Sequence, residues 1–158
     1  QNEALIPNLA AMIDLDMLGR LSASRDLFIS GVGTSPAWAP MVTMMNKGFK
    51  LNIDSSGYGY SDYTTFYNRN IPVLRFSTGY HDDYMKPSDE PSKINYLGVY
   101  DVTNYIFRVK QMMCWPSWKN KKEIWGLFRI SHSLKTAFVL QPVSRIRPLP
   151  NRVCCPVM

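Results

Sequence analysis

Residues 78–89 bring together side chains that could do chemistry, because one histidine, three aspartates and two tyrosines fall within this short segment. They follow the apolar run 71–76, which is typical of a buried strand. Open α/β sheets bind their ligands just outside the carboxyl ends of their strands, so this loop indicates a catalytic or binding site. A solvated polar loop would have the same composition, and the loop by itself does not decide between the two.

A second group of chemistry-bearing residues lies in segment 9–17, whose pattern predicts a strand that ends in alternating apolar and acidic residues. Asp14 and Asp16 are two positions apart, and on a strand such residues point to the same face. Burying two carboxylates costs free energy unless a cation or hydrogen bonds compensate. The pair therefore indicates either a cation-assisted site or a strand end whose acids meet water.

The elements that would position these residues follow from the spacing of apolar side chains. Segments 27–30 and 49–53 predict two further short strands. Segment 96–112 predicts a helix that flanks the sheet, because its apolar residues recur at the spacing of one helical face.

Two more helices are expected from their start signals. Ser35 followed by Pro36 is a favourable N-cap and first helical position, and the apolar residues from Trp38 onward would pack on the sheet. Ser61 is expected to cap a short helix that runs through Tyr67.

Composition excludes several classes of protein. A chain of 158 residues suffices for one domain with a modest core, and 46% hydrophobic residues argue against disorder. No apolar run approaches the length of a membrane-spanning helix. Gly31 and Gly33 lack the third glycine of a dinucleotide site, and no Gly-x-Ser-x-Gly motif occurs. The three cysteines show no C-x-x-C spacing for zinc or redox chemistry.

Charge divides the chain into two compositions. Residues 1–110 carry 10 Lys and Arg against 11 Asp and Glu, whereas residues 111–158 carry 8 against 1. Within the basic part, segment 119–138 predicts an amphipathic helix and segment 142–156 an extended, Pro- and Arg-rich stretch.

Three segments together resemble one family. Residues 78–89, with 61–63 before them and 93–96 after them, resemble the last active-site loop of the co-catalytic zinc aminopeptidases. These are the bacterial leucyl aminopeptidase type, in the zinc-dependent exopeptidase superfamily, whose loop usually runs Thr-Gly-x-His-x-Asp-Tyr-His-x-Pro-x-Asp. The resemblance implies an α/β fold, a mixed sheet flanked by helices as an α/β/α sandwich. Residues 1–112 would be the carboxyl half of that domain, hence incomplete, and residues 113–158 a basic tail.

The resemblance also implies a reaction, the hydrolysis of the first peptide bond of a peptide by two zinc ions that share an aspartate and a water. In the family, the segment Asn-Leu-Asp-Met-x-Gly-Arg carries a zinc ligand, and its aspartate corresponds to Asp16. The tyrosine before the last histidine polarises the scissile carbonyl and corresponds to Tyr84. Asp62 and Asp89 match residues whose implied role is to brace the ligands and the loop.

One departure from the family pattern concerns the metal directly. Met85 stands where the family has its last histidine ligand, and Tyr63 replaces another histidine. A thioether suits copper(I) far better than zinc, and losing an imidazole removes most of a site's affinity for zinc. His81 is a candidate substitute, although the family already has a histidine there that is not a ligand.

The family's remaining ligands and its general base precede the segment that this chain resembles. We therefore expect zinc below full stoichiometry, no hydrolysis by this chain alone, and dependence on a missing amino-terminal half. The expected partners are peptide amino termini, and the resemblance implies a secreted or periplasmic location.

Two other functions remain open. The same cleft could bind peptides or a protein partner without catalysis, as a pseudoenzyme, and the basic tail could bind an anionic surface. Positive charge alone gives only nonspecific affinity, so we expect no specific nucleic acid partner and do not favour a membrane surface.

Overall fold

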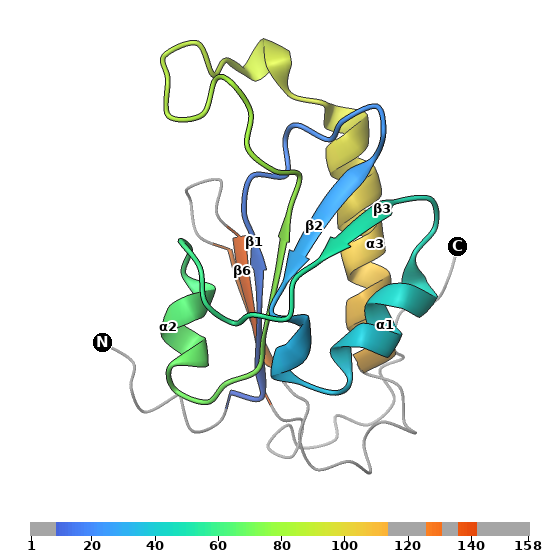
Figure 1. The fold of residues 1–158 in the computed structure, drawn as a ribbon, viewed down its shortest axis with the longest axis vertical. Coiled ribbons are helices and arrows are strands. Elements are labelled where there is room, and N and C mark those ends of the chain that lie inside the picture. Colours follow the sequence, from blue (N-terminus) through green and yellow to red (C-terminus); the bar gives the residue numbers. More distant parts are fainter. Residues whose placement is uncertain (1–8, 114–125, 131–135, 142–158) are drawn as a thin grey trace, which may run out of the picture.

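The structure is a computed structural model that describes residues 9–113, 126–130 and 136–141. They form one mixed β-sheet with helices on both faces (Figure 1), which confirms the predicted α/β class. The strands are β1 (Ala11–Leu15), β2 (Asp26–Ser30), β3 (Lys50–Ile53), β4 (Val73–Ser77), β5 (Gly126–Ile130) and β6 (Thr136–Gln141). The helices are α1 (Trp38–Met45), α2 (Tyr63–Tyr67) and α3 (Tyr96–Met113), with short 3₁₀ helices at Val32–Thr34 and Pro91–Lys93.

Strands β1 and β4 are interior strands of this sheet. The strand order is β3-β2-β4-β1-β5-β6, with an additional pairing of β1 with β6. β1 runs parallel to β4 and β2 parallel to β3, whereas β2 and β4 are antiparallel. On its other side β1 pairs antiparallel with β6 along its whole length, and with β5 at a single residue pair. The loop that follows β4 extends beyond the carboxyl end of this strand, at the top of Figure 1.

Alternation along β1 and β4 assigns each side chain to one face of the sheet. Ile13 and Phe76 belong to the main core, which they share with residues of α1 and α3. Met12 and Val73 instead contact Tyr63 of α2 on the opposite face. Because successive side chains on a strand point to opposite faces, the residues at positions 14, 16 and 75 point to the α2 face.

The predicted helix at 96–112 is confirmed as α3, whose inward stripe includes Val102, Ile106 and Val109, all buried. The predicted start of α1 is wrong by a few residues. Helix α1 begins at Trp38, and the side chain of Ser35 accepts a hydrogen bond from the Ala37 amide, 3.3 Å away, in the turn that precedes the helix.

The predicted amphipathic helix at 119–138 is wrong where the structure describes it. Residues 126–130 form β5 and residues 136–141 form β6, because the backbone groups at the edge of β1 offer hydrogen bonds that a strand can satisfy. Residues 119–125 and 131–135 of the predicted helix, and the predicted extended stretch at 142–156, lie outside the described residues. The predicted division of the chain into a domain part, residues 1–112, and a basic tail, residues 113–158, stays a prediction. Among the described residues, no helix has both the length and the apolar character to cross a bilayer.

Candidate functional site

Two buried aspartates, here called the acid pair, lie on the face of the sheet that α2 covers: Asp14 belongs to β1 and Asp16 directly follows this strand. Asp14 is only 1% exposed and Asp16 only 8% exposed. Both carboxylates contact Ser61 and Arg75, which confirms the prediction that they share one face, and both are largely withdrawn from water. Two carboxylates buried this deeply need partners that compensate their lost hydration.

Ser61 supplies the first of these partners. Its hydroxyl oxygen lies 2.7 Å from Oδ2 of Asp14 and 3.0 Å from Oδ2 of Asp16. A hydroxyl has one proton to donate, so it hydrogen-bonds both carboxyl groups only when one of them is itself protonated. The predicted role of Ser61 as a helix cap is wrong, since α2 has no side-chain cap and this hydroxyl faces the acid pair instead.

Arg75 supplies the second partner, and it comes from the neighbouring strand. In the parallel pairing of β1 with β4, Arg75 is the register partner of Asp14. Its Nη2 lies 3.3 Å from Oδ2 of Asp16 and its Nε 4.0 Å from Oδ2 of Asp14. Its side chain is 18% exposed, and its Nε is buried with no hydrogen-bond partner among the described residues. One guanidinium therefore sits against both carboxyl groups.

The surroundings of Asp14 make its carboxylate easier to protonate than an ordinary one. Burial raises the pKa of Asp14 from 3.8 to about 6. The Ser61 hydrogen bond and the Arg75 charge act in the opposite direction, whereas the Asp16 charge adds to the rise. Tyr63, which replaces a histidine of the family pattern, is buried on the same face of the sheet. Burial raises the pKa of its phenol as well.

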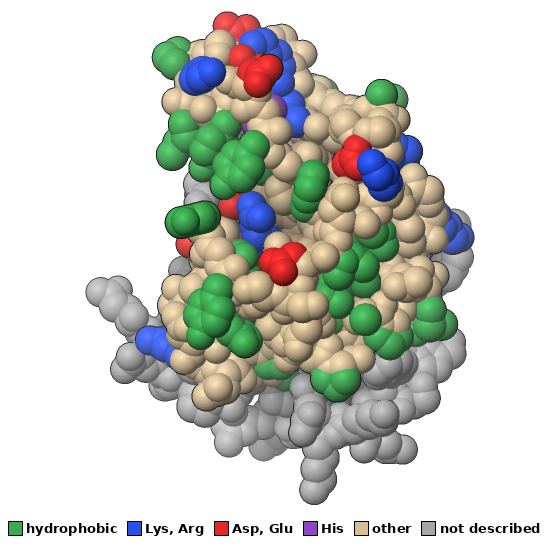
Figure 2. Space-filling model, viewed as in Figure 1, with side chains coloured by type: hydrophobic (Ala, Val, Ile, Leu, Met, Phe, Trp, Pro, Cys, Tyr) green, Lys and Arg blue, Asp and Glu red, His purple; other side chains and the backbone are tan. Residues whose placement is uncertain are grey.

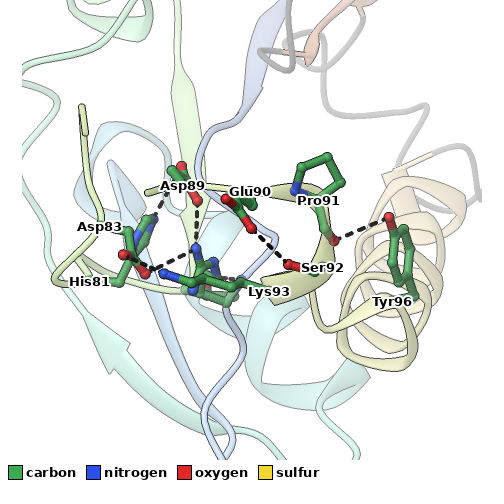
Figure 3. Close-up of polar contacts among 10 residues, drawn as sticks. His81, Asp83, Asp89, Glu90, Pro91, Ser92, Lys93 and Tyr96 are labelled. Carbon is green, nitrogen blue, oxygen red and sulfur yellow. Dashed lines mark hydrogen bonds and ion pairs between the residues drawn. The ribbon is translucent and has the colours of Figure 1, made fainter. Parts of the chain in front are cut away.

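The loop after β4 is held by a network of ion pairs that Figure 3 shows. Arg20 binds Asp89 at 2.5 Å and Asp83 at 3.3 Å, and Lys93 binds Asp83 at 2.7 Å. The Lys93 ammonium is the main reason that the pKa of Asp83 falls to about 2. These contacts join Arg20, which follows β1, to the middle and the end of segment 78–89. The bracing role of Asp89 that the resemblance implies stays a prediction.

His81 belongs to this network. Its Nε2 lies 4.0 Å from Oδ2 of Asp89 (Figure 3), and its Nδ1 is buried without a hydrogen-bond partner among the described residues. Its predicted substitution for the missing zinc ligand stays a prediction. Asp62 is exposed and directly precedes α2, and its charge adds slightly to the rise in the pKa of Asp14.

Tyr84 and Met85 lie at the surface of the loop. The ring of Tyr84 is 42% exposed and stands edge-on to Tyr80, with 5.1 Å between the ring centroids. Met85 has a left-handed backbone with φ of 60° and is 85% exposed. Figure 2 shows hydrophobic side chains on the surface of this part of the molecule, next to the charged side chains at its tip. Met85 thus faces solvent, whereas Asp16 is buried in the sheet.

The described residues do not fit a centre of two zinc ions. Oδ2 of Asp16, one of the two oxygens that this carboxylate could offer to a metal, already accepts hydrogen bonds from Ser61 and Arg75. A guanidinium at this distance repels a second cation, since like charges a few ångströms apart cost free energy at low dielectric. Within the described residues, no three His, Cys, Asp or Glu side chains converge in a way that could hold a metal ion.

Sequence reasoning missed Arg75. The available signal was the basic residue in the otherwise apolar run 71–76, because a charge in an interior strand requires an opposite charge on a neighbouring strand. Among the predicted strands, only segment 9–17 contains acidic residues, so it was the candidate partner of this basic residue.

A family model described as Peptidase family M28 matches residues 1–109. The matched part includes β1 to β4, the acid pair and the braced loop, and most of α3. No curated protein and no solved structure matches the chain.

Proposed function

This chain belongs to peptidase family M28, and we propose that it is a zinc-aminopeptidase-like domain that does not hydrolyse peptides on its own. Members of this family are typically zinc-dependent peptidases. The proposal places the chain with the bacterial leucyl aminopeptidase type and equates it with the carboxyl half of that domain. The corresponding reaction is hydrolysis of the first peptide bond of a peptide.

The observation that carries this proposal is the position of Arg75. Its guanidinium lies beside Asp16, the residue that corresponds to a family zinc ligand, and donates a hydrogen bond to its Oδ2. The acid pair therefore has its positive charge built into β4. The exposed thioether of Met85 supports the same proposal, because it replaces the last imidazole ligand by a weak ligand for zinc.

A second candidate function is binding of a peptide or protein partner without catalysis. It is favoured by the loop after β4, where Tyr80, Tyr84 and Met85 are exposed on a backbone that ion pairs hold in place. Aromatic rings and thioethers provide adaptable apolar contacts at binding surfaces. In this role Tyr84 would contact the partner through its ring instead of polarising a carbonyl.

Activity on leucine p-nitroanilide in the presence of zinc tests the proposal. We expect no release of nitroaniline above the buffer blank from the unaltered chain. We expect none from Met85→His either, because this substitution restores an imidazole but leaves Arg75 in place. Met85→Leu serves as the matched control for any effect of the substitution on the loop.

Turnover by the unaltered chain would overturn the proposed inactivity. Turnover that appears only in Met85→His would show that the missing imidazole alone blocks the reaction, and that Arg75 does not. Binding of a peptide by a chain that shows no turnover would favour the second candidate function.

A further inference from the structure

A cavity of about 450 Å³ lies away from the acid pair, where helix α3 meets two loops. Arg25, Lys47 and Phe49 line it from the loops that precede β2 and β3. Helix α3 packs on the face of the sheet opposite to α2, so this cavity and the acid pair belong to different faces. Its volume falls within the range of pockets that hold small organic ligands.

Helix α3 contributes a polar stripe to the cavity. Tyr100, Asn104 and Arg108 are spaced four residues apart and all line it. Residues at this spacing lie one above another on the same side of a helix. Their hydroxyl, amide and guanidinium groups all carry hydrogen-bond donors. The stripe therefore presents a row of donors next to the buried apolar stripe of the same helix.

Arg25, which lines the cavity from the loop before β2, is held in place by its contacts. Its Nε donates to the carbonyl oxygen of Gly48 at 2.9 Å, and its Nη1 donates to Oδ2 of Asp101 at 2.8 Å. The guanidinium also lies over the ring of Phe49, 4.5 Å from the centroid. A guanidinium fixed in this way loses little conformational freedom when it binds an oxyanion through its remaining donors.

The charges that line the cavity do not balance. Asp101 neutralises Arg25. Among the described residues, the side chains of Lys47 and Arg108 form no hydrogen bond or ion pair, and Nε of Arg108 is buried without an acceptor. An unpaired cation that is partly withdrawn from water is unfavourable unless an anion compensates it. Arg108 is such a cation, and the exposed Lys47 adds a second positive charge beside it. Two positive charges suit a ligand that carries two negative charges.

We propose that this cavity binds the phosphate group of a small molecule. Arg108 and Lys47 would neutralise its two charges. The guanidinium of Arg25 and the hydrogen-bond donors on α3 would bind its oxygens. The rest of the cavity leaves room for the organic part of the ligand. This site does not depend on the acid pair or on whether the chain hydrolyses peptides.

Calorimetric titration with inorganic phosphate tests the proposal, in Tris buffer and against sodium chloride of equal ionic strength. We expect saturable binding of phosphate to the full chain and none of chloride. Arg108→Met and Lys47→Met should each weaken the binding about tenfold, since each removes a charge-assisted hydrogen bond. Lys86→Met is the matched control, because Lys86 is an exposed lysine on the loop after β4, and it should bind phosphate like the parent.

Lys47 is exposed, so its replacement leaves the fold intact and keeps the test valid even if Arg108→Met unfolds. Absence of saturable binding to the parent would overturn the proposal. It would also be overturned if Lys86→Met weakened binding as much as Lys47→Met, because the effect would then reflect net charge alone.

Discussion

Replacing Arg75 by methionine should lower the free energy of unfolding by about 3 kcal/mol at neutral pH. Methionine keeps most of the length of the side chain but removes the only cation within ion-pairing distance of Asp14 and Asp16 among the described residues. Removing one partner of a buried ion pair is costly, because the other charge stays buried without compensation. The measurement is urea denaturation of the parent and the variant, followed by circular dichroism.

Lys50→Met is the control for this experiment. Lys50 also forms an ion pair between strands, with Asp26 at 3.1 Å, but its side chain is largely exposed. Exposed pairs contribute little to stability, so this variant should unfold close to the parent. Adding Asp16→Asn to Arg75→Met should restore part of the lost stability, because it removes the uncompensated charge. An Arg75→Met variant as stable as the parent would contradict the role of Arg75 as the internal counter-ion.

Replacing Asp14 by asparagine should stabilise the protein at neutral pH and remove a pH dependence that the parent shows. Burial raises the pKa of Asp14 to about 6 in the folded protein, above its value of 3.8 in the unfolded chain. The folded state therefore keeps this proton while the unfolded state releases it, and stability falls as the pH rises from about 4 to about 6. A rise of about two pKa units corresponds to a loss of about 3 kcal/mol.

The amide group of asparagine in place of Asp14 could still form a hydrogen bond with the Ser61 hydroxyl, without a charge to bury. We therefore expect Asp14→Asn to gain up to about 3 kcal/mol relative to the parent at pH 7, and almost nothing at pH 4. Urea denaturation across this pH range measures both effects. Asp82→Asn is the control, since Asp82 is exposed on the loop and should leave the pH profile of the parent unchanged. A parent whose stability rises steadily over this range would contradict the raised pKa.

The sequence allowed the elements on either side of the site to be predicted, because their signals are local. Apolar alternation and runs identified β1 to β4, and apolar residues at helical spacing identified α3. The same period of two placed Asp14 and Asp16 on one face from the sequence alone. Local signals of this kind survive because the buried face of each element must be apolar.

The partners of the acid pair could not be predicted, because they depend on contacts between distant segments. Arg75 meets Asp14 only through the register of β4 against β1, and nothing within either strand specifies that register. Ser61 has the features of a helix cap, and the tertiary contact with two carboxylates overrides this local preference. The β5–β6 pair was missed for a similar reason, since its pairing with β1 outweighs the apolar spacing that favoured a helix.

The most direct test of whether Arg75 has taken the place of a metal at the acid pair is titration of the unaltered chain with zinc at neutral pH. The binding is followed by calorimetry, and the zinc that the chain retains is measured by metal analysis after dialysis. Retention of less than one zinc ion per chain, with no saturable heat at micromolar concentration, is the predicted result. Two tightly held zinc ions per chain, lost on replacing Asp16 by asparagine, would contradict it.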